Sequence, residues 1–292
     1  MFADKKLSLT TIVRAFWLQV SVTWTLTLLE TLILVTLPLL IGQSIDGFLN
    51  DTWGPFLWLA SAMSILLLTS VSRRLYDTRA YGRMRVELGA AVAAKAEMGQ
   101  VATTNARLNM SRELIGFLET EAPIVIMALL QVIVSLVVLL SYHGLLAGTA
   151  GGAILAALII YGLSSRRFFR LNGDLNALSE LQVAALESRL YDAVGAHLLA
   201  LRRHEIRLSD TEAIVYGLIF AVLLSMLGTN LWFAATQLAA TPGQIFSIVT
   251  YSYEFIESAV MLPLALQSLT RISEITQRIN RLSDSPPEEE VP

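Results

Sequence analysis

Four side chains that could do chemistry lie close together near the end of the chain, in the stretch from Gln244 to Leu282. They are Tyr251, Tyr253, Glu254 and Glu257. On a helix, two carboxylates three residues apart share one face. At 1.5 Å per residue, Glu254 lies ~15 Å into this stretch, near the middle of a bilayer if the helix crosses one. Carboxylates at that depth predict a pair that couples to protons or cations, or a site for cationic substrate groups.

Each of these residues also has a structural interpretation. The two acids could face a wet cavity, or bond to Gln, Ser or Thr side chains on neighbouring helices. Tyr251 and Tyr253 could line a substrate path, but aromatic residues in membrane helices more often pack or form an interfacial belt. Glu30, in the first apolar stretch, is a further cavity candidate. We favour a structural role for Glu30, paired with Arg14 or with an arginine beyond the lipid.

Composition indicates the class of protein that positions these acids. The 292-residue chain is 54% hydrophobic and 15% charged, with a mean hydropathy of +0.60. Soluble domains carry about a quarter charged residues, so this balance indicates a multi-spanning helical membrane protein. A net charge of −3 without a basic run argues against nucleic acid as a partner. With no cysteine and three scattered histidines, we expect no catalytic residue, no metal site and no cofactor in this chain.

Apolar runs predict six membrane-spanning helices, joined by three short turns and two long polar excursions. Both excursions lack proline, so helices are expected to continue past the lipid as paired arms. Glycines at 144, 148 and 152 are spaced four apart, which predicts a close approach of two helices. The predicted domain is 1–282, followed by a disordered acidic tail at 283–292. The predicted helices span residues 17–49, 56–102, 110–142, 145–196, 208–236 and 244–282.

The positive charges predict how these helices thread the membrane. All 21 Lys and Arg residues lie before the first helix, in the two excursions, or at the far end of the sixth helix. The three short turns contain none. By the positive-inside rule, both termini and both excursions are expected in the cytoplasm. The predicted localisation is an integral membrane protein in contact with lipid, in a bacterial inner membrane.

Three short stretches resemble one known family. Residues 109–115 read Asn-Met-Ser-Arg-Glu-Leu-Ile, a basic group at 166–170 marks where the fourth helix leaves the lipid, and residues 270–275 read Thr-Arg-Ile-Ser-Glu-Ile. Together with the six-helix layout, they resemble the transmembrane domain of ABC exporters, as a stand-alone six-helix domain without its ATPase. Arg112 departs from this pattern, because the family usually has glycine there. No G-x-x-x-x-G-K-[ST] occurs in the sequence, so we expect no ATPase activity in this chain.

The resemblance implies an all-α membrane protein with six transmembrane helices and long cytoplasmic extensions, assembled as a domain-swapped homodimer around a central cavity. It implies that the tips of the arms dock a separate ATPase subunit, through which alone ATP would act. The basic second tip fits contact with lipid headgroups or with an acidic partner about as well as it fits docking to an ATPase. The docking residues expected from the resemblance are Thr104, Asn105, Arg107, Arg202 and Arg203.

Three functions fit these observations. The first is a homodimeric permease that moves a small-molecule or peptide substrate, amphipathic in character, by alternating access, with energy from a separate ATPase. The second keeps the fold but is driven by protons through Glu254 and Glu257, without any ATPase. The third is a membrane scaffold or receptor that does not transport.

Overall fold

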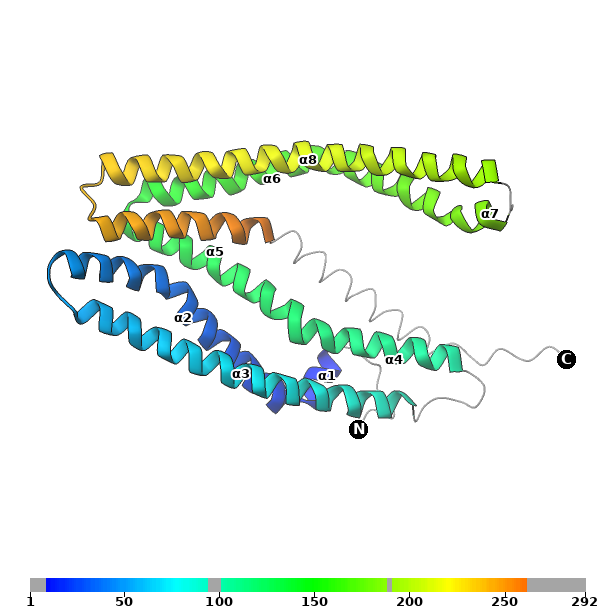
Figure 1. Ribbon diagram of the computed structural model, residues 1–292, viewed down its shortest axis with the longest axis horizontal. Helices are drawn as coiled ribbons and strands as arrows, with labels where there is room; N and C mark the ends of the chain where they lie inside the picture. Colours follow the sequence, from blue (N-terminus) through cyan, green and yellow to red (C-terminus); the bar gives the residue numbers. More distant parts are fainter. Residues whose placement is uncertain (1–8, 94–100, 188–190, 262–292) are drawn as a thin grey trace. The chain divides into compact units, whose positions relative to one another are not determined.

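The chain is helical over the residues that the computed structural model describes, which are 9–93, 101–187 and 191–261 (Figure 1). A last helix covers residues 242–261. The elements before it are α1 (Leu9–Ala15), α2 (Trp17–Leu49), α3 (Gly54–Ala93), α4 (Val101–Gly116), the π-helical turn η1 (Phe117–Glu121), α5 (Ala122–Tyr142), α6 (Gly144–Glu180), α7 (Gln182–Glu187) and α8 (Tyr191–Thr236).

Five helices among the described residues are long and apolar enough to cross a membrane. The first of them, α2, covers the same residues as the first predicted span. The described part of the sixth predicted span is the helix over residues 242–261, which is not one of these five. Its predicted continuation to residue 282, and the predicted tail at 283–292, lie outside the described residues.

Two of the helices are much longer than a bilayer is thick. α3 has 40 residues and α8 has 46, which correspond to ~60 Å and ~69 Å at 1.5 Å per residue. The hydrocarbon core of a bilayer is only ~30 Å thick, so about half of each helix extends beyond it. The apolar half of α3 exposes large side chains such as Trp58 and Leu67, as expected of a surface that contacts lipid.

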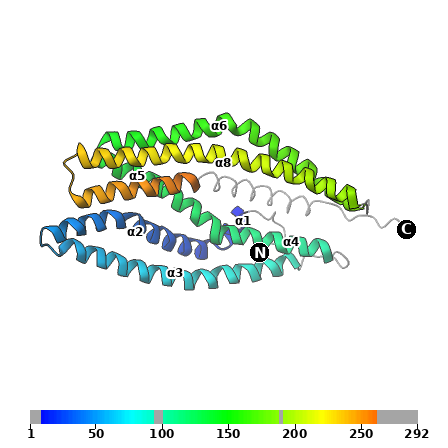
Figure 2. The ribbon, with the colours of Figure 1, turned by 45° about the horizontal axis from the view of Figure 1, so that its top comes forward.

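The chain divides into two compact units, residues 1–135 with 240–292, and residues 136–239. In the first unit, α2 and α3 form an antiparallel hairpin (Figure 2). Asp51, in the turn between them, adopts a left-handed backbone with φ 53°, which aspartate tolerates better than most residues. The turn-forming sequence at residues 50–55 therefore ends one span and starts the next.

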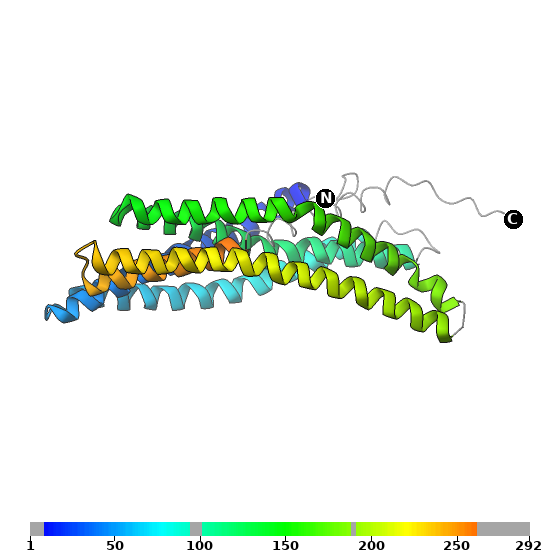
Figure 3. The ribbon, with the colours of Figure 1, turned by 90° about the horizontal axis from the view of Figure 1, so that it is seen from above.

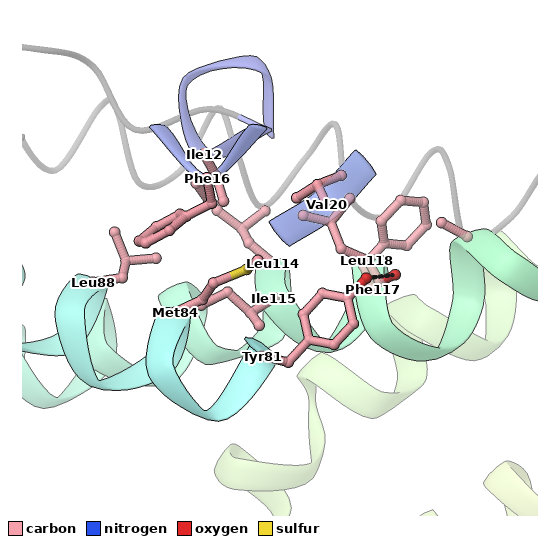
Figure 4. Close-up of a cluster of buried hydrophobic side chains, with 11 residues drawn as sticks. Ile12, Phe16, Val20, Tyr81, Met84, Leu88, Leu114, Ile115, Phe117 and Leu118 are labelled. Carbon is pink, nitrogen blue, oxygen red and sulfur yellow. Dashed lines mark hydrogen bonds between the residues drawn. The ribbon is translucent and has the colours of Figure 1, made fainter. Parts of the chain in front are cut away.

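The core of the first unit lies where α1, α2, α3, α4 and η1 meet (Figure 4). At η1, the backbone N–H of Ala122 donates to the carbonyl of Phe117, five residues back. The carbonyl of Leu118, which an α-helix would pair with Ala122, accepts instead from the Tyr81 hydroxyl at 3.0 Å. The wide turn thus frees one carbonyl, and a buried tyrosine from α3 satisfies it.

In the second unit, α6 and α8 lie side by side and are joined through α7 (Figure 3). α6 buries Leu146, Ala150 and Ala153. The glycines at 144, 148 and 152 do not make this contact, because a Cβ built at each would meet nothing within 4 Å. The close approach predicted at these glycines is therefore not made within the described part of the single chain.

The predicted ends of the second arm are wrong. Its helices were expected to end at 196 and restart at 208, whereas α6 ends at Glu180 and α8 begins at Tyr191. Arg202 and Arg203 consequently lie inside α8 and not at a tip. Residues 191–212 contain no proline, and an apolar residue recurs every seventh position at 194, 201 and 208, a spacing that favours an unbroken helix.

The first arm differs from its prediction in the same way. Residues 103–109 were expected to join its two helices, but α4 already begins at Val101. The residues between α3 and α4, 94–100, lie outside the described part of the chain. Thr104, Asn105 and Arg107 are in α4, and their side chains are not among those described.

Candidate functional site

Two glycines bring the N-terminal end of the last helix into contact with α2. A Cβ at Gly243 would lie 1.9 Å from the carbonyl oxygen of Gly42, and a Cβ at Gly42 would lie 2.4 Å from the carbonyl oxygen of Gly243. Asp46, one turn along α2, accepts the backbone N–H of Gly243 at 2.8 Å and the Thr241 hydroxyl at 2.5 Å. The two backbones therefore meet at a distance that only glycine permits.

The same face of the last helix is bonded to α2 further along. The Ser247 hydroxyl donates to the carbonyl of Pro38 at 3.1 Å, and the Tyr251 hydroxyl donates to the carbonyl of Val35 at 2.7 Å. Positions 243, 247 and 251 are four apart and so share one face. We call this contact the α2 seam; its residues are Gly42, Asp46, Gly243, Ser247 and Tyr251. Tyr251, a predicted cavity residue, is only 1% exposed and belongs to this seam.

Glu254 bonds to a neighbouring helix. Its carboxylate accepts a hydrogen bond from the side-chain amide of Gln131 on α5, and the same amide group also bonds to the Ser135 hydroxyl at 3.3 Å. Glu254 is half-buried and Ser135 is fully buried. The structure therefore gives Glu254 the kind of interhelical amide partner that the structural interpretation anticipated.

Glu257 and Tyr253 lie on a different face of the last helix from the α2 seam. Both are exposed on the single chain, and Tyr253 retains 51% of its accessible surface. The Tyr253 hydroxyl lies against the Glu257 carboxylate. The sequence predicts that this helix crosses a membrane, where a carboxylate must face water or another protein surface because lipid solvates it poorly. We call this surface, formed by Tyr253 and Glu257, the acidic face.

Glu30 pairs with an arginine at the end of the second span. Its carboxylate forms an ion pair with Arg73 on α3 and accepts the Ser70 hydroxyl at 2.5 Å. Of the partners considered for Glu30, the structure selects an arm arginine and not Arg14. Arg73 also reaches Asp77, one turn further along α3, at 3.4 Å. Sequence reasoning missed Asp77, although residues 70, 73, 77 and 81 recur at helical spacing and so define one polar face of α3.

A polar pair also joins the two long helices of the second unit. The Thr149 hydroxyl of α6 donates to the side-chain carbonyl of Asn230 on α8 at 2.6 Å. Asn230 is fully buried, and its amide contacts the Met226 sulfur at 3.4 Å. At the N-terminal end of α6, His143 caps the helix by accepting the N–H of Leu145 at 3.1 Å.

Breaking this pair is expected to have a modest effect. Asn230→Leu should lower the free energy of unfolding by about 0.6 kcal/mol, since interhelical hydrogen bonds in membranes contribute little on average. Thr149→Val should cost about the same, and the double variant no more than either single one. SDS titration in mixed micelles measures the free energy of unfolding of the two single variants and of the double variant. Additive losses would show that the two side chains do not act as a pair.

No group of three or more histidine and carboxylate side chains in the described residues could hold a metal ion. The α2 seam fixes the last helix, and the acidic face presents a carboxylate and a phenol.

Five long apolar helices among the described residues make this an integral membrane protein. Residues 9–243 match the family model described as ABC transporter transmembrane region. The match covers well over half of the chain, which therefore belongs to this family. No nucleotide-binding domain is matched in these 292 residues. No match was found among curated proteins.

Proposed function

We propose that this chain is one half of a homodimeric transporter of the ABC-exporter type, working by alternating access. The acidic face is the observation that carries the proposal. Glu257 and Tyr253 are exposed on the single chain in a helix that is expected to span the membrane. A path enclosed by two copies supplies the water that a mid-span carboxylate requires.

The same face supports an amphipathic or peptide-like solute as the substrate. A phenol beside a carboxylate offers an aromatic surface together with a negative charge, which suits solutes that combine apolar and cationic groups. The distribution of Lys and Arg supports a bacterial inner-membrane location with both termini in the cytoplasm.

The energy is proposed to come from a separate ATPase that docks where the second arm ends. Leu181, Val183 and Leu186 are 58%, 64% and 56% exposed around α7. α7 lies about 20 Å beyond the basic residues Arg166 and Arg167 that mark the end of the span, at 1.5 Å per residue. Exposed apolar side chains so far from the span favour a protein interface. The docking surface that we propose for this arm is therefore α7, and not Arg202 and Arg203 as the sequence predicted.

Leu186→Asp is expected to abolish ATP-driven transport without lowering the amount or stability of the chain. The substitution places a charge in the proposed apolar contact, where it would be buried without a partner. Transport into membrane vesicles and the SDS-unfolding curve measure the two quantities. Glu187→Gln, beside the patch and exposed, serves as the matched control variant. Unchanged transport by Leu186→Asp would remove α7 from the docking surface.

The function itself is tested with inverted vesicles of the native membrane, compared with vesicles that lack the chain. The probe is a fluorescent amphipathic peptide. ATP-dependent accumulation that vanadate blocks and an uncoupler does not affect is the expected result. Absence of accumulation under every energy source would contradict transport and leave the scaffold or receptor function.

One observation favours a second candidate, a proton-coupled transporter of the same fold. Glu254 is half-buried, and its hydrogen-bond partner Gln131 is a neutral amide. A carboxylate without a fixed cation can exchange a proton more readily than one held in an ion pair. Accumulation that needs no ATP, collapses with the uncoupler and is lost in Glu254→Gln would select this mechanism.

A further inference from the structure

An open cavity of about 530 Å³ lies beside the core of the first unit, where α1, α2, η1 and α5 meet. We call it the α1 groove. Its buried walls are apolar, and Val20, Phe117 and Leu118 lie together there (Figure 4). Its volume falls within the ~300–1,000 Å³ of pockets that bind small molecules, so it can hold part of a ligand. The residues that line it are Val13, Arg14, Val20, Ser21, Trp24, Phe117, Leu118 and Ala122.

The π-helical turn η1 shapes one wall of this groove. Phe117 and Leu118 belong to the turn, and Ala122 directly follows it. The Leu118 carbonyl accepts the Tyr81 hydroxyl at 3.0 Å, which ties this wall to α3. Turns of this kind are rare and occur frequently at functional sites. The turn is therefore a second reason, independent of the volume of the cavity, to assign a function to the α1 groove.

Arg14 and Ser21 supply the solvent-facing hydrogen-bond donors of the groove. They are the two exposed residues among those that line it. In the part of the chain that the structure describes, neither side chain has a hydrogen-bond or ion-pair partner, and no described carboxylate lines the groove. A guanidinium and a hydroxyl both donate to anionic oxygens, and arginine suits phosphate in particular. The groove therefore fits a ligand that joins an apolar body to a phosphate and carries a net negative charge.

The surroundings of the groove favour a lipid over a water-soluble ligand. Trp17 and Leu18, at the start of α2, are 63% and 57% exposed, so the apolar surface continues outside the groove along a helix that is able to cross a membrane. The first 16 residues of the sequence carry three basic side chains and one acidic one. The cytoplasmic leaflet is rich in anionic lipids and attracts basic segments beside a span. An anionic phospholipid meets the apolar surface and the charge together.

We propose that the α1 groove binds one anionic phospholipid of the cytoplasmic leaflet. The Arg14 guanidinium and the Ser21 hydroxyl donate to the headgroup phosphate, and an acyl chain packs against Trp24 and Phe117. The lipid thus contacts both α2 and η1, where the first arm becomes a span. This inference rests on the cytoplasmic location of the N-terminus proposed above. It does not depend on transport, because lipid binding is measured without any substrate or energy source.

Native mass spectrometry of the full chain in detergent micelles tests the site, with phosphatidylglycerol or phosphatidylcholine as the added lipid. The wild-type chain should retain one phosphatidylglycerol more tightly than phosphatidylcholine. Arg14→Gln should lower this preference about fivefold, the effect of one basic residue at an anionic surface. Arg79→Gln removes the same charge from an exposed position of α3 that does not line the groove, and it should keep the preference. Equal retention of both lipids by the wild type, or equal behaviour of the two variants, would overturn the proposal.

A second variant fills the groove and leaves Arg14 in place. Ser21→Trp puts a large side chain at an exposed lining position, and it should abolish the tightly held lipid. Undiminished retention would place the lipid elsewhere on the chain. Deletion of residues 1–8, which lie outside the described part, should not raise the lipid affinity, and a rise of about tenfold would make the chain's own N-terminus the occupant. A shift from dimer to monomer in Arg14→Gln, with lipid retention unchanged, would make the groove an interface between two copies.

Discussion

Arg73→Met is expected to lower the free energy of unfolding by about 3 kcal/mol. The substitution leaves Glu30 without its counterion in a site where only 14% of its side chain is exposed. Removing one partner of a buried ion pair costs 3–5 kcal/mol, and the effect lies at the lower end because 26% of the Arg73 side chain is exposed. SDS titration in mixed micelles measures the loss.

The chain supplies a matched control on the same helix. Arg83 pairs with Glu87, four residues on, with 70% and 44% of the two side chains exposed. Arg83→Met should leave the free energy of unfolding nearly unchanged, because exposed ion pairs contribute little. The double variant Arg73→Met/Glu30→Gln should recover part of the loss. If Arg73→Met were as harmless as Arg83→Met, the pairing of α2 with α3 would not depend on this charge.

Gly243→Ala is expected to destabilise the α2 seam by about 3 kcal/mol, the upper part of the range for overpacking. The new Cβ would lie 1.9 Å from the Gly42 carbonyl oxygen and 2.7 Å from the Asp46 carboxylate. The Gly42 carbonyl belongs to a helix backbone that cannot give way locally, so the last helix must move off α2. That movement also breaks the 2.8 Å bond from the Gly243 N–H to Asp46.

The control for this substitution is Gly228→Ala in α8, where an added Cβ meets nothing within 4 Å. It should be neutral or slightly stabilising, since alanine favours a helix over glycine. Gly42→Ala should resemble Gly243→Ala, and the double variant should cost less than the sum of the two, because both disturb one contact. Full additivity, or a stable Gly243→Ala chain, would mean that the two helices do not pack through these glycines.

Five of the six predicted spans coincide with helices long and apolar enough to cross a membrane, because lipid imposes a simple rule. An apolar run must continue until it leaves the hydrocarbon, and turn-forming residues such as Asn50 and Asp51 then end it. No such rule applies to the arms. The alternation of charged and apolar residues at 191–212 fits a helix or a tip, and the resemblance suggested a tip at Arg202, whereas α8 continues through it.

The site was less predictable, because hydropathy does not say which face of a helix is covered. Tyr251 and Tyr253 are two residues apart and read alike, yet one is buried in the α2 seam and the other is exposed on the acidic face. Gln131 and Glu254 are 123 positions apart in the chain, so only the fold brings them together. The π-helical turn could have been suspected from Pro123, since kinks and wide turns collect at proline.

The proposed transport path requires that the acidic face open onto water, and thiol labelling measures this directly. The chain has no cysteine, so Glu257→Cys creates a single thiol. In native membranes it should react with a charged, membrane-impermeant methanethiosulfonate, because thiols react as thiolates and these form only in contact with water. Leu67→Cys, on a lipid-facing part of α3, should stay unlabelled. If Glu257→Cys proved as inert as Leu67→Cys, the acidic face would be dry and the transport path would not pass it.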